Sequence, residues 1–279
     1  MDTVILPVRH PLLRRHIQSF LFFKEHTRQS FAYTTFPNTN VCLAIYRNNQ
    51  VIYNVNGSTN HCKVSKGNGK VNSRLYGFHR LPFSVSIDGT IDQICILFKP
   101  GGLRSFTHEG FSDLWQSNEV LEDLFPGKVI RLIDLLFSSD APVTRANLLE
   151  QFLLSRLLSG KSNSLLQTSL RLIEQNTDPL TVNHLATSLN VNESTLYRLF
   201  LDHIGQSPKA FCQTIRFRHA LSALAQRPEG KLTELAYKHD YYDQAHYIKD
   251  LKQFTGFTPK QLKCRFFVEQ SELIWIPSR

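Results

Sequence analysis

Two stretches in the second half of the chain repeat one pattern: Gly205-Gln206-Ser207-Pro208-Lys209 and Gly256-Phe257-Thr258-Pro259-Lys260. They stand 51 residues apart, and the same offset aligns Leu196 with Tyr247. A pattern that recurs at a fixed period indicates that one supersecondary unit is used twice. Because Gly tolerates the left-handed backbone that ends a helix and Pro is favoured in a first helical turn, each stretch predicts the junction of two helices.

The residues before Gly205 predict two helices joined by a tight turn. Thr181 can cap the first helix, whose apolar residues recur at helical spacing. Asn190 stands at the turn, where a left-handed backbone is needed and Asn is the non-Gly residue that tolerates it best. The second helix starts at about Asn192, and its inward-facing residues are Leu196, Leu199 and Phe200.

The second copy has the same layout, with a turn at Asp240, a cap at Asp243 and inward-facing Tyr247, Leu251 and Phe254. Between the copies, residues 208–225 predict one continuous amphipathic helix, about 27 Å long at ~1.5 Å per residue. The sequence therefore predicts an all-α domain at residues 165–270. It contains two helix-turn-helix units, at about 181–203 and 231–255.

The outward faces of the two second helices bear on whether these units bind DNA. Both faces carry polar or cationic side chains, whose donors and acceptors can read base edges and phosphates. An ordinary solvated helix face is the alternative, but two copies that each place a polar face on the second helix favour DNA binding. The predicted recognition helices span 192–203 and 243–255, and the candidate DNA-binding residues are Ser194, Tyr197, Arg198, Gln244, Ala245, His246, Lys249 and Lys252.

Composition agrees with a globular protein that has a polyanionic partner. The chain has 279 residues, 42% of them hydrophobic, and a net charge of +9. Its five cysteines include no C-x-x-C pair, which argues against a disulfide framework or a cysteine-based zinc site. No stretch has the length and apolar character of a membrane span, and the amino terminus does not resemble a signal peptide. We therefore expect a cytoplasmic protein.

The first hundred residues predict a β-rich unit. Residues 41–46, 50–53, 84–87 and 93–98 are rich in β-branched and aromatic residues and are bounded by turn residues, including Asn48-Asn49. Strands at this spacing are typical of an antiparallel sandwich or a cupin-like barrel. The Gly-rich residues 66–70 predict a hairpin turn rather than a phosphate loop, because no strand–loop–helix context surrounds them.

After residue 103, the apolar residues recur at helical spacing. Helices at 129–137 and 146–158 are expected either to pack on the β unit or to form a dimer contact. Residues 159–164 have the composition of a short linker, and everything after it is predicted to be helical. The fold class is therefore α+β with two domains, of which residues 1–160 form a β-rich sensor or dimerisation-type domain with trailing helices.

Residues from about 170 to 265 resemble the DNA-binding domain of the AraC/XylS family of bacterial transcription regulators. Residues 236–247 carry most of the likeness, together with Lys252, Phe254, Gly256, Thr258 and Pro259. The resemblance implies a sequence-specific regulator that inserts both recognition helices into successive major grooves of double-stranded DNA, without a cofactor. The further partners it suggests are a second copy of the chain, RNA polymerase and a small-molecule effector.

This sequence departs from the family pattern in both turns and at Lys249, and also at Leu251, where the family favours Phe, and at Lys263, where it favours Arg. Asn190 and Asp240 replace the Gly that the family usually has in each turn, and Lys249 stands where the family favours Arg. Lys keeps the charge but lacks the planar fork that grips a base in two places, so base preference at this position is expected to differ.

The amino-terminal half leaves three functions open. Residues 98–102 and 76–78 are similar to the β-rich sensor-like domain of such regulators, which would hold an effector. A domain that only dimerises or recruits a partner explains the same residues without an effector. A cupin-like enzyme is the third reading, but His61, His79 and His108 stand singly and form no metal motif, so we expect neither a metal site nor catalysis.

Overall fold

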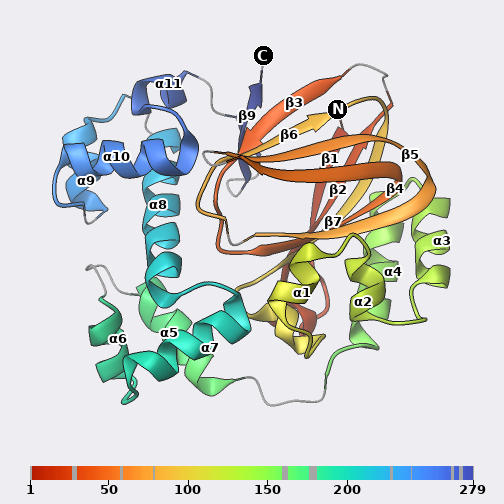
Figure 1. Ribbon diagram of the computed structural model, residues 1–279, viewed down its shortest axis with the longest axis horizontal. Helices are drawn as coiled ribbons and strands as arrows, with labels where there is room; N and C mark the ends of the chain where they lie inside the picture. Colours follow the sequence, from red (N-terminus) through yellow and green to blue (C-terminus); the bar gives the residue numbers. More distant parts are fainter. Residues whose placement is uncertain are drawn as a thin grey trace.

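Alternating apolar residues in the amino-terminal half build a curved sheet (Figure 1). The computed structural model describes residues 2–26, 30–56, 59–77, 79–158, 163–175, 181–226, 229–239, 241–264, 267–269 and 273–278. The sheet order β1-β2-β7-β4-β5-β6-β3 is antiparallel except for the β5–β6 pair. These strands are β1 (Asp2–Pro7), β2 (Ile17–Glu25), β3 (Phe31–Thr35), β4 (Val41–Asn56), β5 (Thr59–Tyr76), β6 (Phe83–Ile87) and β7 (Ile91–Phe98).

Strand β4 shows how the two faces of the sheet differ. Successive side chains of a strand point to opposite faces. Leu43 and Ile45 join the core between the sheet and the helices that follow it, whereas Ala44 and Tyr46 join a second core on the other face. The β-rich domain predicted from the sequence is thus present, with an interior of its own.

Two predicted turns in this sheet are wrong. Asn48-Asn49 and residues 66–70 lie inside the long strands β4 and β5, where the register shifts between Arg47 and Asn49. Asn48 has a φ of 63°. The backbone at Gly67 approaches so closely that an added Cβ would lie 2.8 Å from the carbonyl carbon of Asn49. Asn48 and Gly67 therefore form part of a β-bulge, because a bulge needs the same backbone freedom as a turn.

The helices that trail the sheet pack on one of its faces. They are α1 (Phe111–Gln116), α2 (Val120–Leu124), α3 (Ile130–Ser138) and α4 (Pro142–Leu154), preceded by short 3-10 turns at Leu13–Arg15 and Gly102–Ser105. Leu149 and Leu153 of α4 are 0% and 1% exposed within the core of their own domain. Leu149 and Leu153 of the predicted 146–158 helix thus pack on the parent domain.

The carboxyl-terminal domain has two cores that share one long helix. Unit 1 comprises α6 (Val182–Ser188) and α7 (Glu193–Ile204), and unit 2 comprises α9 (Leu232–Lys238) and α10 (Gln244–Thr255). Helix α8 (Pro208–Gln226) runs between the two units in Figure 1, and it contributes Phe211 to the core of unit 1 and Phe217 to that of unit 2. The domain is completed by α5 (Ser164–Gln175) and α11 (Pro259–Lys263).

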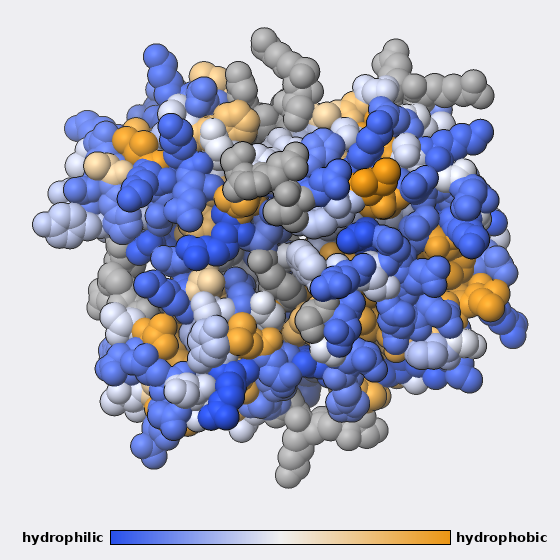
Figure 2. All heavy atoms as spheres, viewed as in Figure 1, coloured by the Kyte–Doolittle hydropathy of each residue, from blue (hydrophilic) through white to orange (hydrophobic). Residues whose placement is uncertain are grey.

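The prediction that the chain stays helical to its end is wrong. Strands β8 (Phe267–Glu269) and β9 (Leu273–Ser278) follow α11, and β9 pairs antiparallel with β3 of the amino-terminal sheet. Residues 273–278 contain the β-branched and aromatic types that favour strands. Within the described ranges, no helix combines the length and apolar character needed to cross a bilayer. The face seen in Figure 2 is largely hydrophilic, with apolar side chains in separate patches.

Candidate nucleic-acid interface

Both helix-turn-helix units close their turn with the same backbone hydrogen bond. In unit 1, the N–H of Val191 donates to the carbonyl of Ala186 at 3.0 Å. In unit 2, the N–H of Tyr241 donates to the carbonyl of Ala236, also at 3.0 Å. The two bonds are related by the 50-residue offset between these pairs, so the repeat in the sequence is also a repeat in the backbone.

The turn and exit residues of unit 1 take the predicted conformations. Asn190 has a φ of 53°, and the Thr181 hydroxyl accepts from the N–H of His184 to cap α6. Gly205 ends α7 with a φ of 83°, and Gly256 ends α10 with a φ of 75°. The turn residue of unit 2, Asp240, lies outside the described residues.

The second helix of each unit starts at a side-chain cap. The Asn192 side chain accepts from the N–H of Thr195 at 2.7 Å, and the Asp243 carboxylate accepts from the N–H of His246 at 2.7 Å. Each cap satisfies a donor that the helix itself leaves unpaired. Both helices present one apolar stripe to their cores, in which the buried residues include Leu196, Phe200, Tyr247, Leu251 and Phe254 and Leu199 is half-buried.

On α7, the three predicted DNA-binding residues lie on the exposed face. Ser194, Tyr197 and Arg198 are all exposed, and the Tyr197 side chain keeps 49% of its surface. The Arg198 Nε donates a long hydrogen bond of 3.4 Å to the Ser194 carbonyl. Arg198 also lines a groove between α7 and the amino-terminal domain.

On α10, four of the five predicted residues are exposed: Gln244, Ala245, Lys249 and Lys252. The Gln244 amide oxygen accepts from the Thr233 hydroxyl of α9 at 2.7 Å, which orients its amide. No ion pair joins Lys249 or Lys252 to another residue in the described ranges. Their ammonium groups are therefore available to an anion.

The fifth predicted residue, His246, is half-buried. Its ring stands edge-on to Tyr241 with 5.3 Å between the centroids, and its Nε2 lies 3.9 Å from Asp250 Oδ1. The same carboxylate accepts from Arg216 of α8 at 2.9 Å, and that guanidinium stacks over Tyr241 at 4.6 Å. This cation of α8 thus holds unit 2 together, and burial raises the pKa of the Tyr241 hydroxyl beside it.

Comparison with known families identifies this helical region. A family model described as a helix-turn-helix domain matches residues 185–265, which include most of unit 1 and all of unit 2. These residues form an AraC-type helix-turn-helix domain. A second family model, described as a domain of unknown function (DUF6597), matches residues 6–119 of the β-rich domain.

Relatives of the AraC-type domain include two bacterial proteins. An uncharacterized HTH-type transcriptional regulator of Haemophilus influenzae is 27% identical over 42% of this chain and 38% of its own length. Regulatory protein ada of Salmonella typhimurium is 33% identical over 33% of this chain and 26% of its own length. The chain thus spans about a third of these relatives. Among solved structures, ToxT from Vibrio cholerae is 11% identical to this chain. The match covers 88% of this chain and 97% of the ToxT chain, with a TM-score of 0.44.

Exposure reveals two tyrosines of the AraC-type domain that the sequence reasoning missed. Tyr242 directly precedes the α10 cap and is 86% exposed, and Tyr237 on α9 is 65% exposed. A hydrophobic residue directly before a helix cap often packs against the first turns of the helix. Here the residue directly before the cap is the exposed Tyr242, and Tyr241, one position earlier, packs against Tyr247 of α10 instead. Only the structure distinguishes the packed tyrosine from the exposed one.

The AraC-type domain is fastened to the β-rich domain at unit 1. The Arg104 guanidinium donates to the Asp202 carboxylate at 2.6 Å and to the Asp202 carbonyl at 2.7 Å, near the end of α7. It also donates to the Glu109 carbonyl at 2.6 Å and lies over the Phe111 ring. One arginine therefore fixes a recognition helix to the amino-terminal domain with two hydrogen bonds, while a third holds the guanidinium within its own domain.

Proposed function

We propose that this protein is a sequence-specific DNA-binding regulator of transcription that acts in the cytoplasm. In this proposal, α7 and α10 enter successive major grooves of one duplex, and the protein performs no chemical reaction. The observation that carries the proposal is the equivalence of the two units, with matching turn bonds, side-chain caps and exposed polar faces. If the two units served only as structural support, nothing would require the second helix of each to carry an exposed polar face.

The spacing of the units supports two successive grooves. Helix α8 has 19 residues and runs between the units (Figure 1). At ~1.5 Å per residue it spans about 28 Å, which is close to the ~34 Å of one turn of DNA. Because both cores are anchored on α8, the separation between α7 and α10 is fixed rather than adjustable.

The proposed contacts are the exposed residues of the two recognition helices. Arg198 can grip a guanine with two parallel hydrogen bonds, whereas Lys249 and Lys252 attract phosphates as point charges. Gln244 can read an adenine edge. Tyr242 extends the surface at the start of α10. His246 has a smaller share, because its ring is engaged with Tyr241.

A homodimer remains part of the proposal, with a different contact from the leucine stripe of α4. Ile130 and Leu135 of α3 and Val143 of α4 are 72%, 43% and 45% exposed. These side chains are apolar and lie on helices that contact each other. Ile130→Glu with Leu135→Glu should leave the fold intact and yield a monomer in sedimentation velocity, whereas an unchanged mass would contradict a contact at this face.

Control by a small-molecule effector in the amino-terminal domain is the last part of the proposal. The β-rich domain holds a cavity, and it contacts unit 1 through Arg104. A regulator whose DNA-binding domain is fastened to a domain with a cavity has the parts needed for ligand control.

Selection from a randomised duplex library tests the proposal. The full-length protein should enrich a site with two conserved parts whose centres lie about 10 base pairs apart. Affinity for this site should fall steeply with salt, because phosphate neutralisation releases counterions. The matched control is the double variant Arg198→Ala/Lys249→Ala, which should melt like the wild type but enrich no site. Failure of the folded wild type to enrich any sequence would contradict the proposal.

A further inference from the structure

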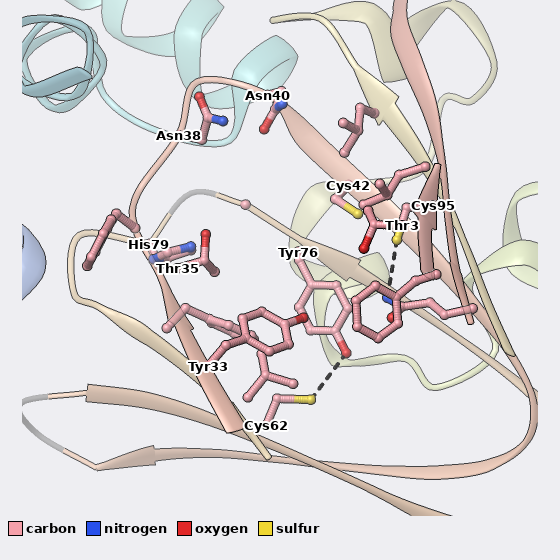
Figure 3. Close-up of a pocket in the computed structure, with 18 of the residues that line it drawn as sticks. Thr3, Tyr33, Thr35, Asn38, Asn40, Cys42, Cys62, Tyr76, His79 and Cys95 are labelled. Atoms are coloured by element: carbon pink, nitrogen blue, oxygen red, sulfur yellow. Dashed lines mark hydrogen bonds between the residues drawn. The ribbon is translucent and has the colours of Figure 1, made fainter. Parts of the chain in front are cut away.

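A cavity of about 170 Å³ opens inside the curved sheet of the amino-terminal domain (Figure 3). It lies on the face of the sheet that carries Ala44 and Tyr46, opposite the face covered by α1 to α4. Its size resembles that of cavities of ~150 Å³ known to hold one benzene ring. A ligand of this cavity is therefore about the size of a single ring with one or two substituents.

The wall of the cavity carries no formal charge. Among the described residues that line it, none is Asp, Glu, Lys or Arg. Burial raises the pKa of the Tyr33, Tyr46 and Tyr76 hydroxyls and lowers the pKa of His79. These groups therefore stay neutral near pH 7. A charged ligand would lose its hydration there without gaining a counter-charge, which is costly.

The polar groups deep in the cavity mostly satisfy one another. The Gln93 amide donates to the Tyr46 hydroxyl at 3.1 Å and to Cys95 Sγ at 3.1 Å. The Tyr46 hydroxyl in turn lies 3.1 Å from that of Tyr76, which lies 3.5 Å from Cys62 Sγ, as Figure 3 shows for the tyrosine and the cysteine. The rings of Tyr46 and Tyr76, held by these hydrogen bonds, give the cavity a neutral aromatic wall against which a ligand ring can stack.

Among the fully buried side-chain N and O atoms of the described lining residues, one lacks a hydrogen-bond partner. The hydroxyl oxygen of Thr3 is buried and has no hydrogen-bond partner among the described residues. A buried hydroxyl without a partner costs free energy that a ligand with one hydroxyl or carbonyl group would recover. The wall and this hydroxyl together select an uncharged ring that carries one polar group.

Phe36 connects the cavity to the AraC-type domain. This residue follows β3, lines the cavity and is 2% exposed. Its ring belongs to the core of unit 2, in which Phe217, Leu221 and Leu251 are fully buried. Asn38, on the same loop, lies at one end of the cavity in Figure 3. A ligand that presses on Phe36 therefore presses on the packing beneath α10.

We propose that the cavity binds an uncharged single-ring compound with one hydroxyl or carbonyl group, and that Phe36 transmits its occupancy to unit 2. This inference rests on the proposed function, because it names the effector class and the route by which that effector alters DNA binding. The coupling needs no contact between the ligand and DNA.

Calorimetric titration of the full-length protein tests the ligand class. Benzyl alcohol and toluene should both bind, whereas benzoate, which has the same ring but a negative charge, should show at least tenfold weaker binding. Thr3→Val should weaken the binding of benzyl alcohol about tenfold, the equivalent of ~1.4 kcal/mol. It should leave the affinity for toluene unchanged. Benzoate binding as tightly as benzyl alcohol, or no binding of either neutral probe, would overturn the assignment.

Two matched variants test the route through Phe36. Phe36→Leu and Phe83→Leu each remove one aromatic ring from the cavity wall, but Phe83 belongs to the core of the sheet and not to that of unit 2. Saturating benzyl alcohol should change the affinity of the wild type for its selected duplex by at least about fivefold. Phe83→Leu should keep this change and Phe36→Leu should lose it.

The outcomes separate this inference from the proposed function. Binding of the selected duplex without benzyl alcohol depends on the proposed function alone. If the duplex binds and benzyl alcohol also binds but leaves the DNA affinity unchanged, the coupling is wrong. If both leucine variants respond like the wild type, the route through Phe36 is wrong.

Discussion

Arg198 and Lys249 occupy the exposed faces of equivalent helices but differ in chemistry. Arg198→Ala should cost about 1–3 kcal/mol of binding free energy and relax the preference at one base position, because a planar fork is lost. Lys249→Ala should weaken all sequences more evenly and reduce the slope of log affinity against log salt by about one. Binding to the randomised library at two salt concentrations measures both effects.

Phe200→Ala is the contrasting variant, because it removes a core side chain instead of an exposed one. Phe200 is fully buried in unit 1, so its loss should cost ~3–5 kcal/mol of stability and abolish binding through unfolding. The melting temperatures of Arg198→Ala and Lys249→Ala should stay near that of the wild type, since exposed substitutions change stability little. Wild-type binding by both exposed variants would show that the DNA-facing side of the helices was wrongly assigned.

The side-chain caps of the two recognition helices are expected to contribute equally to stability. Asn192→Ala and Asp243→Ala should each lower the free energy of unfolding by about 1 kcal/mol, because one backbone donor loses its acceptor. Asn192→Asp and Asp243→Asn keep an acceptor and should retain most of that stability. Urea unfolding followed by circular dichroism measures the difference, and equal losses in the Ala and conservative variants would rule out a capping role.

The 3-10 turn after β7 makes a sharper prediction. A Cβ added to Gly102 would overlap the backbone carbonyl group of His16, whose carbon would lie 2.8 Å away, and Gly102 itself is buried. Gly102→Ala should therefore prevent folding of the β-rich domain. Gly69→Ala meets nothing within 4 Å and should cost only the strain of its φ of 88°, ~1 kcal/mol. Soluble yield and melting temperature distinguish the two, and similar behaviour would contradict the close approach.

Elements whose signals are local could be predicted from the sequence, and elements that depend on distant partners could not. Asn192, Gly205 and their counterparts act within one helical turn, so both units were predictable down to their caps. Asn48 and Gly67 carry the same local signal as a turn, but long-range pairing of β4 with β5 converts them into a bulge. Strand β9 pairs with residues about 240 positions earlier, which no local pattern reveals. The cavity depends on the curvature of the whole sheet, so its lining was not predictable either.

For the whole molecule, the burial of Phe36 predicts how the separated domain behaves. The core of unit 2 contains this residue of the amino-terminal half, whereas the buried core of unit 1 is built from helical-domain residues in the described chain. In a fragment of residues 164–279, unit 2 should therefore lose ~3–5 kcal/mol of stability through the missing ring. Unit 1 should change little.

Hydrogen exchange of backbone amides measures this asymmetry. Protection should fall in α9 and α10 of the fragment and persist in α6 and α7. The full-length variant Phe36→Ala is the control, because it should show the same selective loss with every other contact present. Equal protection of both units in the fragment would contradict a shared core. A gel-shift titration at low salt then shows whether the fragment, with unit 1 intact, still binds duplex DNA.

The pairing of β9 with β3 gives the helical domain two points of attachment, one at each of its ends. This pairing adds to the Arg104–Asp202 contact at unit 1 and to Phe36 in the core of unit 2, so both units are held against the amino-terminal domain. The strand pairing does not depend on the covalent linker between the domains. Cutting the chain in the segment 159–162 should leave the two pieces associated, as in a split protein, and size-exclusion chromatography of the cleaved protein would show one peak.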